Sequence, residues 1–285
     1  MFTLNCPICA QPLLCDNSHR SWRCDNGHSF DVAKQGYVNL LPVQNKRSKD
    51  PGDSKAMVQA RAEFLRAKYY QPLADKIAQV VLNGKPQTLL DAGCGEGYYL
   101  RELLAQADLR QQSLNCVGLD ISKWAVLSAA KQAAATLSAS TQEPRVTWLV
   151  ASNSQIPLPT DSVDTLLCLF GFPVSAEFKR VLKPGGRLIM VDPASEHLLE
   201  LKQIIYPQVN SKPEQLPVPA DTWQLADEQR LTFALEITER EHIQHLLTMT
   251  PHLYRASSEG RARAAALEHI TVTADMWVRT FVSVD

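Results

Sequence analysis

The sequence has no excess of charge of either sign and no long apolar run. Lys and Arg together number 29 and Asp and Glu number 30, so the formal net charge is −1. A near-neutral chain has no overall field that attracts nucleic acid, so a nucleic-acid partner would require a local basic patch. No stretch approaches the roughly 18 consecutive apolar residues of a membrane span, and we expect no membrane segment.

The N-terminal residues also lack the basic and apolar regions of a secretory signal, and we expect a cytoplasmic protein. Cysteine is sparse over most of the chain, but four of the seven cysteines fall within the first 24 residues. An odd number concentrated at one end favours metal binding in a reducing compartment over a disulfide framework. The 285 residues, 45% of them hydrophobic, permit one large domain and a small one.

The expected metal ligands stand in two closely spaced pairs. Cys6 and Cys9 form a C-x2-C pair, and Cys24 and His28 form a C-x3-H pair 14 residues later. Each pair fits a tight knuckle, and three sulfurs with one imidazole are typical of structural zinc. Zinc binding supplies free energy that about 40 residues with little apolar material lack. The weaker alternatives as ligands are Cys15 and His19.

Glycine is scarce, with 12 in the chain, yet Gly93, Gly95 and Gly97 occupy alternate positions directly after an apolar run. Glycine allows a tight turn and close approach of the backbone to a ligand. Asp91 ends the apolar run before these glycines, and Asp120 ends the next one. A carboxylate at the end of a second strand suits the hydroxyls of a ribose. The pattern predicts a site for a nucleoside-bearing cofactor.

The glycine spacing distinguishes between such cofactors. Dinucleotide sites have the spacing G-x-G-x-x-G and place a pyrophosphate at a helix N-terminus. Here the spacing is G-x-G-x-G, with Glu96 inside the loop. An acidic residue there favours a ligand without phosphate, such as the sulfonium and amino acid of S-adenosylmethionine (SAM). The string resembles motif I of the class I SAM-dependent methyltransferases, and residues 182–186 resemble the turn before their fifth strand. This resemblance implies an α/β, Rossmann-like fold.

Apolar periodicity predicts the elements around this motif. Ser54 is the expected N-cap of a helix, with Met57, Ala60, Phe64 and Leu65 on its apolar face. A second helix is expected to end at residues 83–84. Further helices are expected over 96–107 and 123–137, and strands are expected to end at 120 and to cover 146–150 and 165–170.

Two loops bear on the cofactor and the substrate. Many methyltransferases carry an Asp for the adenine amino group just before a Leu-Pro; here Asn153 lies in that region. Residues 170–173 lack the Asn/Asp-Pro-Pro-aromatic string of enzymes that methylate exocyclic amines. Cys168 lies inside an apolar run, which is unlike the nucleophile of C5-pyrimidine enzymes. The basic segment around Lys46 and Arg47 is either a solvated hinge or an arm that contacts RNA phosphates.

The whole chain resembles the RlmA/RrmA family of 23S ribosomal RNA guanine-N1 methyltransferases. The resemblance is carried by the zinc pairs, residues 34–42, residues 50–54 and residues 91–99. It implies zinc on the four ligands named above and SAM contacts from Tyr70, Gly95, Glu96 and His197. It further implies a homodimer that binds a hairpin of 23S rRNA.

These observations predict a zinc-binding module over 1–42 for RNA recognition, a basic linker with helices over 43–84 and a SAM-dependent methyltransferase domain over 85–285. The expected reaction is methyl transfer from SAM to N1 of a guanine, and the alternative is transfer to a small molecule or another RNA. His197 and Asp192 are the candidate proton acceptors. Phe170, Phe172 and Tyr99 are candidates to stack on the base.

Overall fold

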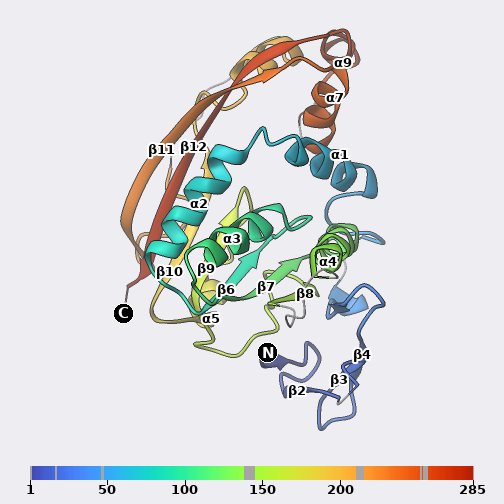
Figure 1. Cartoon of the computed structure of the whole chain (residues 1–285), viewed down its shortest axis with the longest axis vertical. Coiled ribbons are helices and arrows are strands. Elements are labelled where there is room, and N and C mark those ends of the chain that lie inside the picture. Colours follow the sequence, from blue (N-terminus) through green and yellow to red (C-terminus); the bar gives the residue numbers. More distant parts are fainter. Residues whose placement is uncertain are drawn as a thin grey trace.

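The computed structural model describes residues 2–16, 18–45, 48–137, 145–209, 215–250, 252 and 256–284. Lys46 and Arg47, the centre of the predicted basic segment, lie outside the described residues. The chain forms a large twisted sheet with helices on both sides, and a small N-terminal sheet lies below it (Figure 1). No helix among the described residues is long and apolar enough to span a membrane.

The large sheet has eight strands in the order β11-β12-β10-β9-β6-β7-β8-β5. Five neighbouring pairs, from β10 to β5, are parallel, whereas β12 pairs antiparallel with β10 and β11. The order reverses between β6 and β9, which is where ligands bind in doubly wound sheets. The strands are β5 (Tyr37–Asn39), β6 (Thr88–Ala92), β7 (Asn115–Asp120), β8 (Val146–Val150), β9 (Val163–Leu169), β10 (Leu182–Pro193), β11 (Trp223–Ile237) and β12 (Ile270–Ser283).

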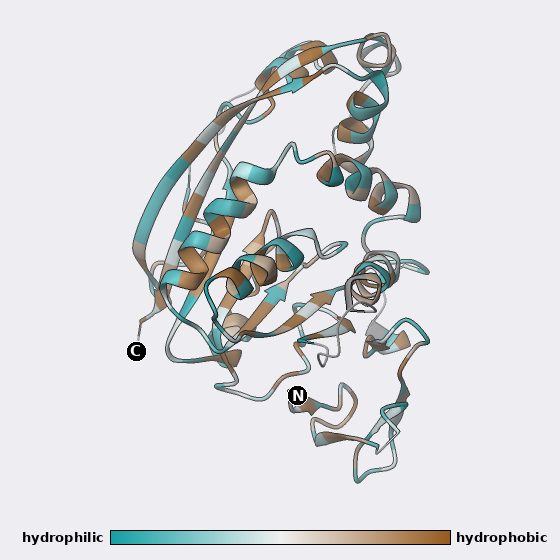
Figure 2. Cartoon of the chain, in the orientation of Figure 1, coloured by the Kyte–Doolittle hydropathy of each residue, from teal (hydrophilic) through white to brown (hydrophobic). Residues whose placement is uncertain are grey.

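The helices bury apolar stripes against the two faces of this sheet (Figure 2). One core contains α2, α3 and α4, and the opposite core contains α5. The long antiparallel pair of β11 and β12 extends beyond the other strands toward α7 and α9, which connect the two strands, and α7 packs against α1 (Figure 1). The helices are α1 (Lys55–Arg66), α2 (Gln71–Asn83), α3 (Tyr98–Leu109), α4 (Lys123–Leu137), α5 (Ser175–Val181), α6 (Leu199–Ile205), α7 (Arg240–Met249) and α9 (Ser258–Ala265).

The N-terminal module has its own sheet, in the order β1-β2-β3-β4. Its strands are β1 (Leu4–Asn5), β2 (Pro12–Cys15), β3 (Ser21–Arg23) and β4 (Ser29–Asp31). The chain then enters the large sheet as β5, whose Val38 lies opposite Leu149 of β8, and a 3-10 turn, η1 (Val43–Asn45), follows. The module is therefore joined to the larger domain through a shared sheet as well as through the covalent chain.

Most predicted elements are confirmed. The helix at 123–137 and the strand at 146–150 have the predicted bounds, and Ser54 caps α1 by accepting a hydrogen bond from Met57 N at 3.3 Å. Helix α3 begins at Tyr98 rather than at 96, because Gly95 and Gly97 have positive φ angles that a helix does not allow. The predicted turn at 182–186 is the start of β10, where the pairing with β9 shifts register.

Candidate functional site

The glycine loop joins β6 to α3 at the point where the strand order reverses. The N–H groups of Gly93 and Cys94 donate to Leu119 O at 2.8 and 3.0 Å, and Gly95 N donates to Asp120 Oδ2 at 3.0 Å. Gly97 has φ +81°, and a Cβ there would lie 2.7 Å from the ring of Trp148. A Cβ on Gly93 would meet no described atom within 4 Å. The loop is packed tightly at Gly97 and leaves space at Gly93.

Asp91 and Asp120 lie at the ends of adjacent strands, beside this space. Asp91 is buried, and its Oδ1 has no hydrogen-bond partner among the described residues. Burial, and then the nearby Asp120, raises the pKa of Asp91 from 3.8 to about 8. Burial also raises the pKa of Asp120, against the hydrogen bonds donated by Ser122 N and Gly95 N. The site therefore holds carboxyl groups in an environment that favours a cationic or hydroxyl-bearing ligand.

The side chain of Glu96 was expected to face the ligand, but one of its oxygens is bound by neighbouring side chains of the protein. Its Oε2 accepts hydrogen bonds from Arg101 at 2.9 Å and Gln132 at 2.6 Å. Its Oε1 is buried and unpaired within the described part of the chain. The charge of Glu96 is thus balanced by Arg101 on α3. A cofactor could therefore bind only to Oε1 of Glu96 or to the backbone of the loop.

Asn153 bonds to the residue before the glycine loop, and Tyr70 packs among aromatic rings. Asn153 Nδ2 donates to Ala92 O at 3.4 Å, and its Oδ1 is buried without a partner in the residues that the structure describes. Tyr70 precedes α2 and is buried, with its ring edge-on to Phe170 and Phe233 at 6.4 and 6.2 Å between centroids. Burial raises the pKa of Tyr70, so its hydroxyl stays protonated.

His197 is held by the backbone of β12. Its Nδ1 accepts a hydrogen bond from Asp275 N at 3.2 Å, which places the proton of the neutral ring on Nε2. Burial lowers the pKa of His197 to about 4, so the ring is neutral near pH 7. Its ring lies 6.1 Å from that of Phe170, which is 37% exposed and has a positive φ of 54°. His197 therefore offers a hydrogen-bond donor beside an exposed aromatic ring.

Asp192 lies at the end of β10, opposite Trp277 of β12. Its Oδ2 is 4.0 Å from Arg279 Nη1 and makes no hydrogen bond to any described residue. Burial raises the pKa of Asp192, and the charge of Arg279 opposes that increase. Arg279 is itself paired with Glu228 at 2.6 Å. Asp192 is therefore a weakened acid with one buried oxygen that accepts no hydrogen bond from any described residue.

Two features of the site were missed in the sequence. Asp275 is a buried hub that accepts two hydrogen bonds from Arg230 and one from Thr232, and it orients His197 through its backbone. Arg61 of α1 lies over the glycine loop, with its Cδ 4.0 Å from the position of a Cβ on Gly95. Arg61 is 34 residues from that glycine and Asp275 is 78 from His197, so no local spacing could have indicated either contact.

The four predicted zinc ligands meet in the N-terminal module. Their ligand atoms all lie within 4.8 Å of one another. Cys24 Sγ is 3.7 Å from Cys9 Sγ and 3.4 Å from His28 Nδ1, and Cys6 Sγ is 3.5 Å from His28 Nδ1. A tetrahedral zinc with Zn–S bonds of about 2.3 Å separates its sulfurs by about 3.8 Å. The four atoms therefore fit zinc.

The alternative ligands lie apart from this cluster. Cys15 Sγ is 3.8 Å from His19 Nδ1, and neither residue belongs to the cluster found among the described residues. With all four positions filled by protein, the ion has a structural rather than a catalytic role.

The residues at the glycine loop also fit SAM. The buried oxygens of Asp91 and Asn153 lack partners within the described residues, as does Arg61 Nε. A ligand with hydroxyls, amino groups and a carboxylate would offer a hydrogen-bond partner to each of the three. SAM has each of these groups, and it supplies a methyl group on a cationic sulfur.

Comparisons with known proteins agree with both sites. A family model described as "RlmA, N-terminal", a zinc ribbon, matches residues 4–49, and one described as "Methyltransferase domain" matches residues 89–186. The chain has a class I SAM-dependent methyltransferase fold with an N-terminal zinc-binding module.

Three curated relatives match along most of the chain. The first is a 23S rRNA (guanine(748)-N(1))-methyltransferase of Streptomyces fradiae, 37% identical over 70% of this chain and 66% of its own length. Proteins described as putative 23S rRNA (guanine-N(1)-)-methyltransferases are 35% identical in Micromonospora griseorubida and 31% identical in Bacillus subtilis, each over 70% of this chain and 68% of the relative. The match spans about two thirds of each relative. With zinc ligands and glycine loop both in place, the chain belongs to the RlmA family of SAM-dependent methyltransferases.

Proposed function

We propose that the protein transfers a methyl group from SAM to N1 of a guanine in a hairpin of 23S rRNA. The observation that carries this proposal is the joining of a zinc-binding module to a methyltransferase sheet through β5, in a chain whose curated relatives are described as acting on guanine N1 of 23S rRNA. A methyltransferase for small molecules needs no such module.

The reaction requires alignment and a proton acceptor. The methyl group of SAM is already electrophilic, so the protein mainly has to place nucleophile, methyl carbon and sulfur in line. Guanine N1 carries a proton that must be lost, and N1 is inaccessible in a base pair, so the base must lie in a loop or leave its stack. Phe170 is well placed to stack on the base, because it is partly exposed and lies beside His197.

Of the two candidate proton acceptors, Asp192 has the better geometry. His197 uses its Nδ1 lone pair on Asp275 N and carries its proton on Nε2, so the neutral ring has no free lone pair. Asp192 has a buried oxygen that accepts no hydrogen bond from the described residues and lies 4.0 Å from Arg279. We assign proton acceptance to Asp192 and hydrogen-bond donation, for example to guanine O6, to His197.

The other candidates to stack on the base have less suitable positions. Phe172 is 90% exposed, and Tyr99 packs edge-on against Tyr98 at 5.2 Å. The proposal also retains a homodimer in the cytoplasm, with residues 1–42 as the zinc-binding module for RNA recognition, 43–84 as a basic linker with helices and 85–285 as the methyltransferase domain.

The test is methylation of 23S rRNA from a strain that lacks the corresponding gene, with purified protein and labelled SAM. We expect one strong stop of reverse transcriptase at a guanine, because N1-methylguanine cannot pair. Hydrolysis of the RNA should yield N1-methylguanosine by mass spectrometry. Stable SAM binding without transfer to any rRNA, but with transfer to a small molecule or another RNA, would contradict the proposal and support the alternative.

A further inference from the structure

The sequence-predicted cofactor residues leave one group of SAM without a partner. They comprise three carboxyl groups, of Asp91, Glu96 and Asp120, together with neutral side chains and backbone. These can bind the ribose hydroxyls, the ammonium group and the sulfonium. The methionine part of SAM also ends in a carboxylate, and a guanidinium is the side chain that binds a carboxylate most strongly. An arginine at the glycine loop would therefore hold it.

Arg61 occupies this position. Its Cδ is 4.0 Å from where a Cβ of Gly95 would lie. Its charge acts on Asp120, Tyr70 and Tyr99, lowering the pKa of each against the effect of burial. A side chain that acts on strand β7, on the start of α2 and on α3 lies among the elements that form the cofactor site.

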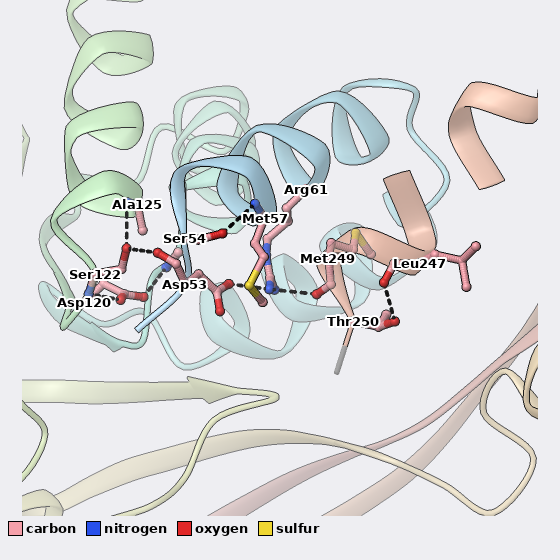
Figure 3. A network of polar contacts seen from close by, with 11 residues as sticks. Asp53, Ser54, Met57, Arg61, Asp120, Ser122, Ala125, Leu247, Met249 and Thr250 are labelled. Carbon is pink, nitrogen blue, oxygen red and sulfur yellow. Dashed lines mark hydrogen bonds and ion pairs between the residues drawn. The ribbon is translucent and has the colours of Figure 1, made fainter. Parts of the chain in front are cut away.

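The guanidinium of Arg61 is only partly used within the protein. Nη2 donates to Asp53 Oδ2 at 2.7 Å and to Met249 O at 3.1 Å, both of which are drawn in Figure 3. Nε is buried and has no partner among the described residues. A buried N–H without an acceptor is costly, by about 1–3 kcal/mol, and a carboxylate is the strongest acceptor for a guanidinium.

The contacts of Arg61 also fix its direction. Asp53 O accepts a hydrogen bond from Ser122 Oγ at 2.7 Å, and Ser122 N donates to Asp120 Oδ1 at 2.7 Å (Figure 3). The segment before α1 is thereby tied to the end of β7, the strand that carries the ribose-binding carboxylate. Arg61 is held against the loop from one side by this segment and from the other by α7.

From this geometry we propose that Arg61 binds the carboxylate of the methionine moiety of SAM. The proposal rests on the cofactor of the proposed function and does not depend on which RNA is methylated. It assigns a cofactor contact to α1, which lies before the methyltransferase motif in the chain.

Two inert ligands test it: S-adenosylhomocysteine and its decarboxylated analogue, which lacks only the carboxylate. Binding is measured by isothermal titration calorimetry, without RNA. We expect the wild type to bind the intact ligand about 10- to 100-fold more tightly than the analogue. Arg61→Gln should weaken binding of the intact ligand by a similar factor and bind both ligands with nearly equal affinity.

Arg66→Gln is the matched control. Arg66 lies on the same helix but is exposed and paired with Glu63, so we expect wild-type affinity for both ligands. Arg61→Lys keeps the charge and carries the test if the glutamine variant does not fold. It should weaken the intact ligand several-fold and leave the analogue unchanged.

The proposal is overturned if either Arg61 variant weakens both ligands equally, because Arg61 would then only connect α1 to α7. Undiminished discrimination between the two ligands in Arg61→Gln also overturns it. Failure of the wild type to bind S-adenosylhomocysteine would instead contradict the proposed methyltransferase function.

Discussion

The zinc-binding module and the methyltransferase sheet hold their polar groups in opposite ways. In the module, few apolar side chains are buried, among them Leu4, Leu13 and Trp22, and the buried thiols of Cys6 and Cys24 belong to the metal cluster. In the sheet, large apolar cores on both faces support the carboxylates of Asp91, Glu96 and Asp192, each with one oxygen that has no hydrogen-bond partner within the described residues. The polar metal ligands therefore stabilise the zinc-binding module. In the methyltransferase sheet the buried polar groups instead destabilise the fold and serve the cofactor site.

Loss of a zinc ligand should have the largest effect of any single substitution. Zinc contributes free energy on the order of 10 kcal/mol to small structural sites, so Cys24→Ser should unfold residues 2–31, which form the small sheet, and leave the large sheet with β5 folded. The measurements are zinc content by mass spectrometry and limited proteolysis. Cys15→Ser, which removes a thiol outside the cluster, is the control and should keep its zinc. Full zinc content in Cys24→Ser would show that the module does not depend on this ligand, and the contrast with the sheet, whose fold depends on apolar cores, would be lost.

Removal of the half-buried carboxylate of Asp192 at the end of β10 should affect catalysis but not folding. Without a proton acceptor, Asp192→Asn should lower kcat on rRNA about 100-fold, with affinity for S-adenosylhomocysteine within about threefold of wild type. In the wild type, activity should increase with pH through the raised pKa of Asp192, because only the ionised carboxylate accepts a proton.

The control for this variant is Glu228→Gln, which alters the other carboxylate that contacts Arg279. It should retain most of the activity. A comparable loss in both variants would show that Asp192 acts only through Arg279, and proton acceptance would have to be assigned elsewhere.

Asp91 tests whether the sheet is stabilised when a site residue is neutralised. Its pKa is raised from 3.8 to about 8 on folding, so the protonated form is favoured in the folded state. The contribution of protonated Asp91 to the stability of the wild type is fully present below pH 4 and is lost as the pH rises through 8. Cofactor-free Asp91→Asn should therefore become more stable relative to wild type between pH 5 and pH 9, by about 1–3 kcal/mol.

Denaturant unfolding at several pH values measures this difference. Asp108→Asn, at a carboxylate that is 56% exposed, is the control and should show no comparable gain. Parallel pH profiles for wild type and Asp91→Asn would mean that the burial of Asp91 imposes no electrostatic cost on folding.

The smallest effect is expected at a polar contact on the surface of the larger domain. Ser54→Ala removes the N-cap of α1 and should cost about 1 kcal/mol, a decrease of a few degrees in Tm. Ser54→Asp, which also caps helices, should restore the loss. An unchanged Tm in Ser54→Ala would indicate that packing of α1 against α7 alone determines this helix end.

The sequence predicted the elements whose signals are local. Ser54, three of the four predicted apolar positions of α1, the bounds of α4 and β8 and the end of β7 follow from caps and periodicity over a few residues. The exceptions are Met57, which is only half-buried while its neighbour Val58 is buried, and β6, which continues one residue past Asp91. The two pairs of zinc ligands are also local signals, because the residues of each pair are three or four positions apart and this spacing brings their ligand atoms together.

The parts that were missed depend on contacts distant in sequence. Arg61 reaches Met249, 188 residues away, and Asp275 positions His197 through pairing of β10 with β12. Glu96 was correctly placed in the loop, but its partner Arg101 was not foreseen. Strand periodicity cannot specify which side chains meet across a sheet until the strand order is known.

The short strand β5 has a consequence for the handling of this protein. Strand β8 would be the edge of the large sheet without the pairing of Tyr37–Asn39. An uncovered edge exposes unpaired backbone groups that recruit strands from other molecules. A fragment that starts after residue 42 would therefore expose the unpaired edge of β8 and tend to aggregate. Attempts to express the methyltransferase domain alone should retain residues 37–39.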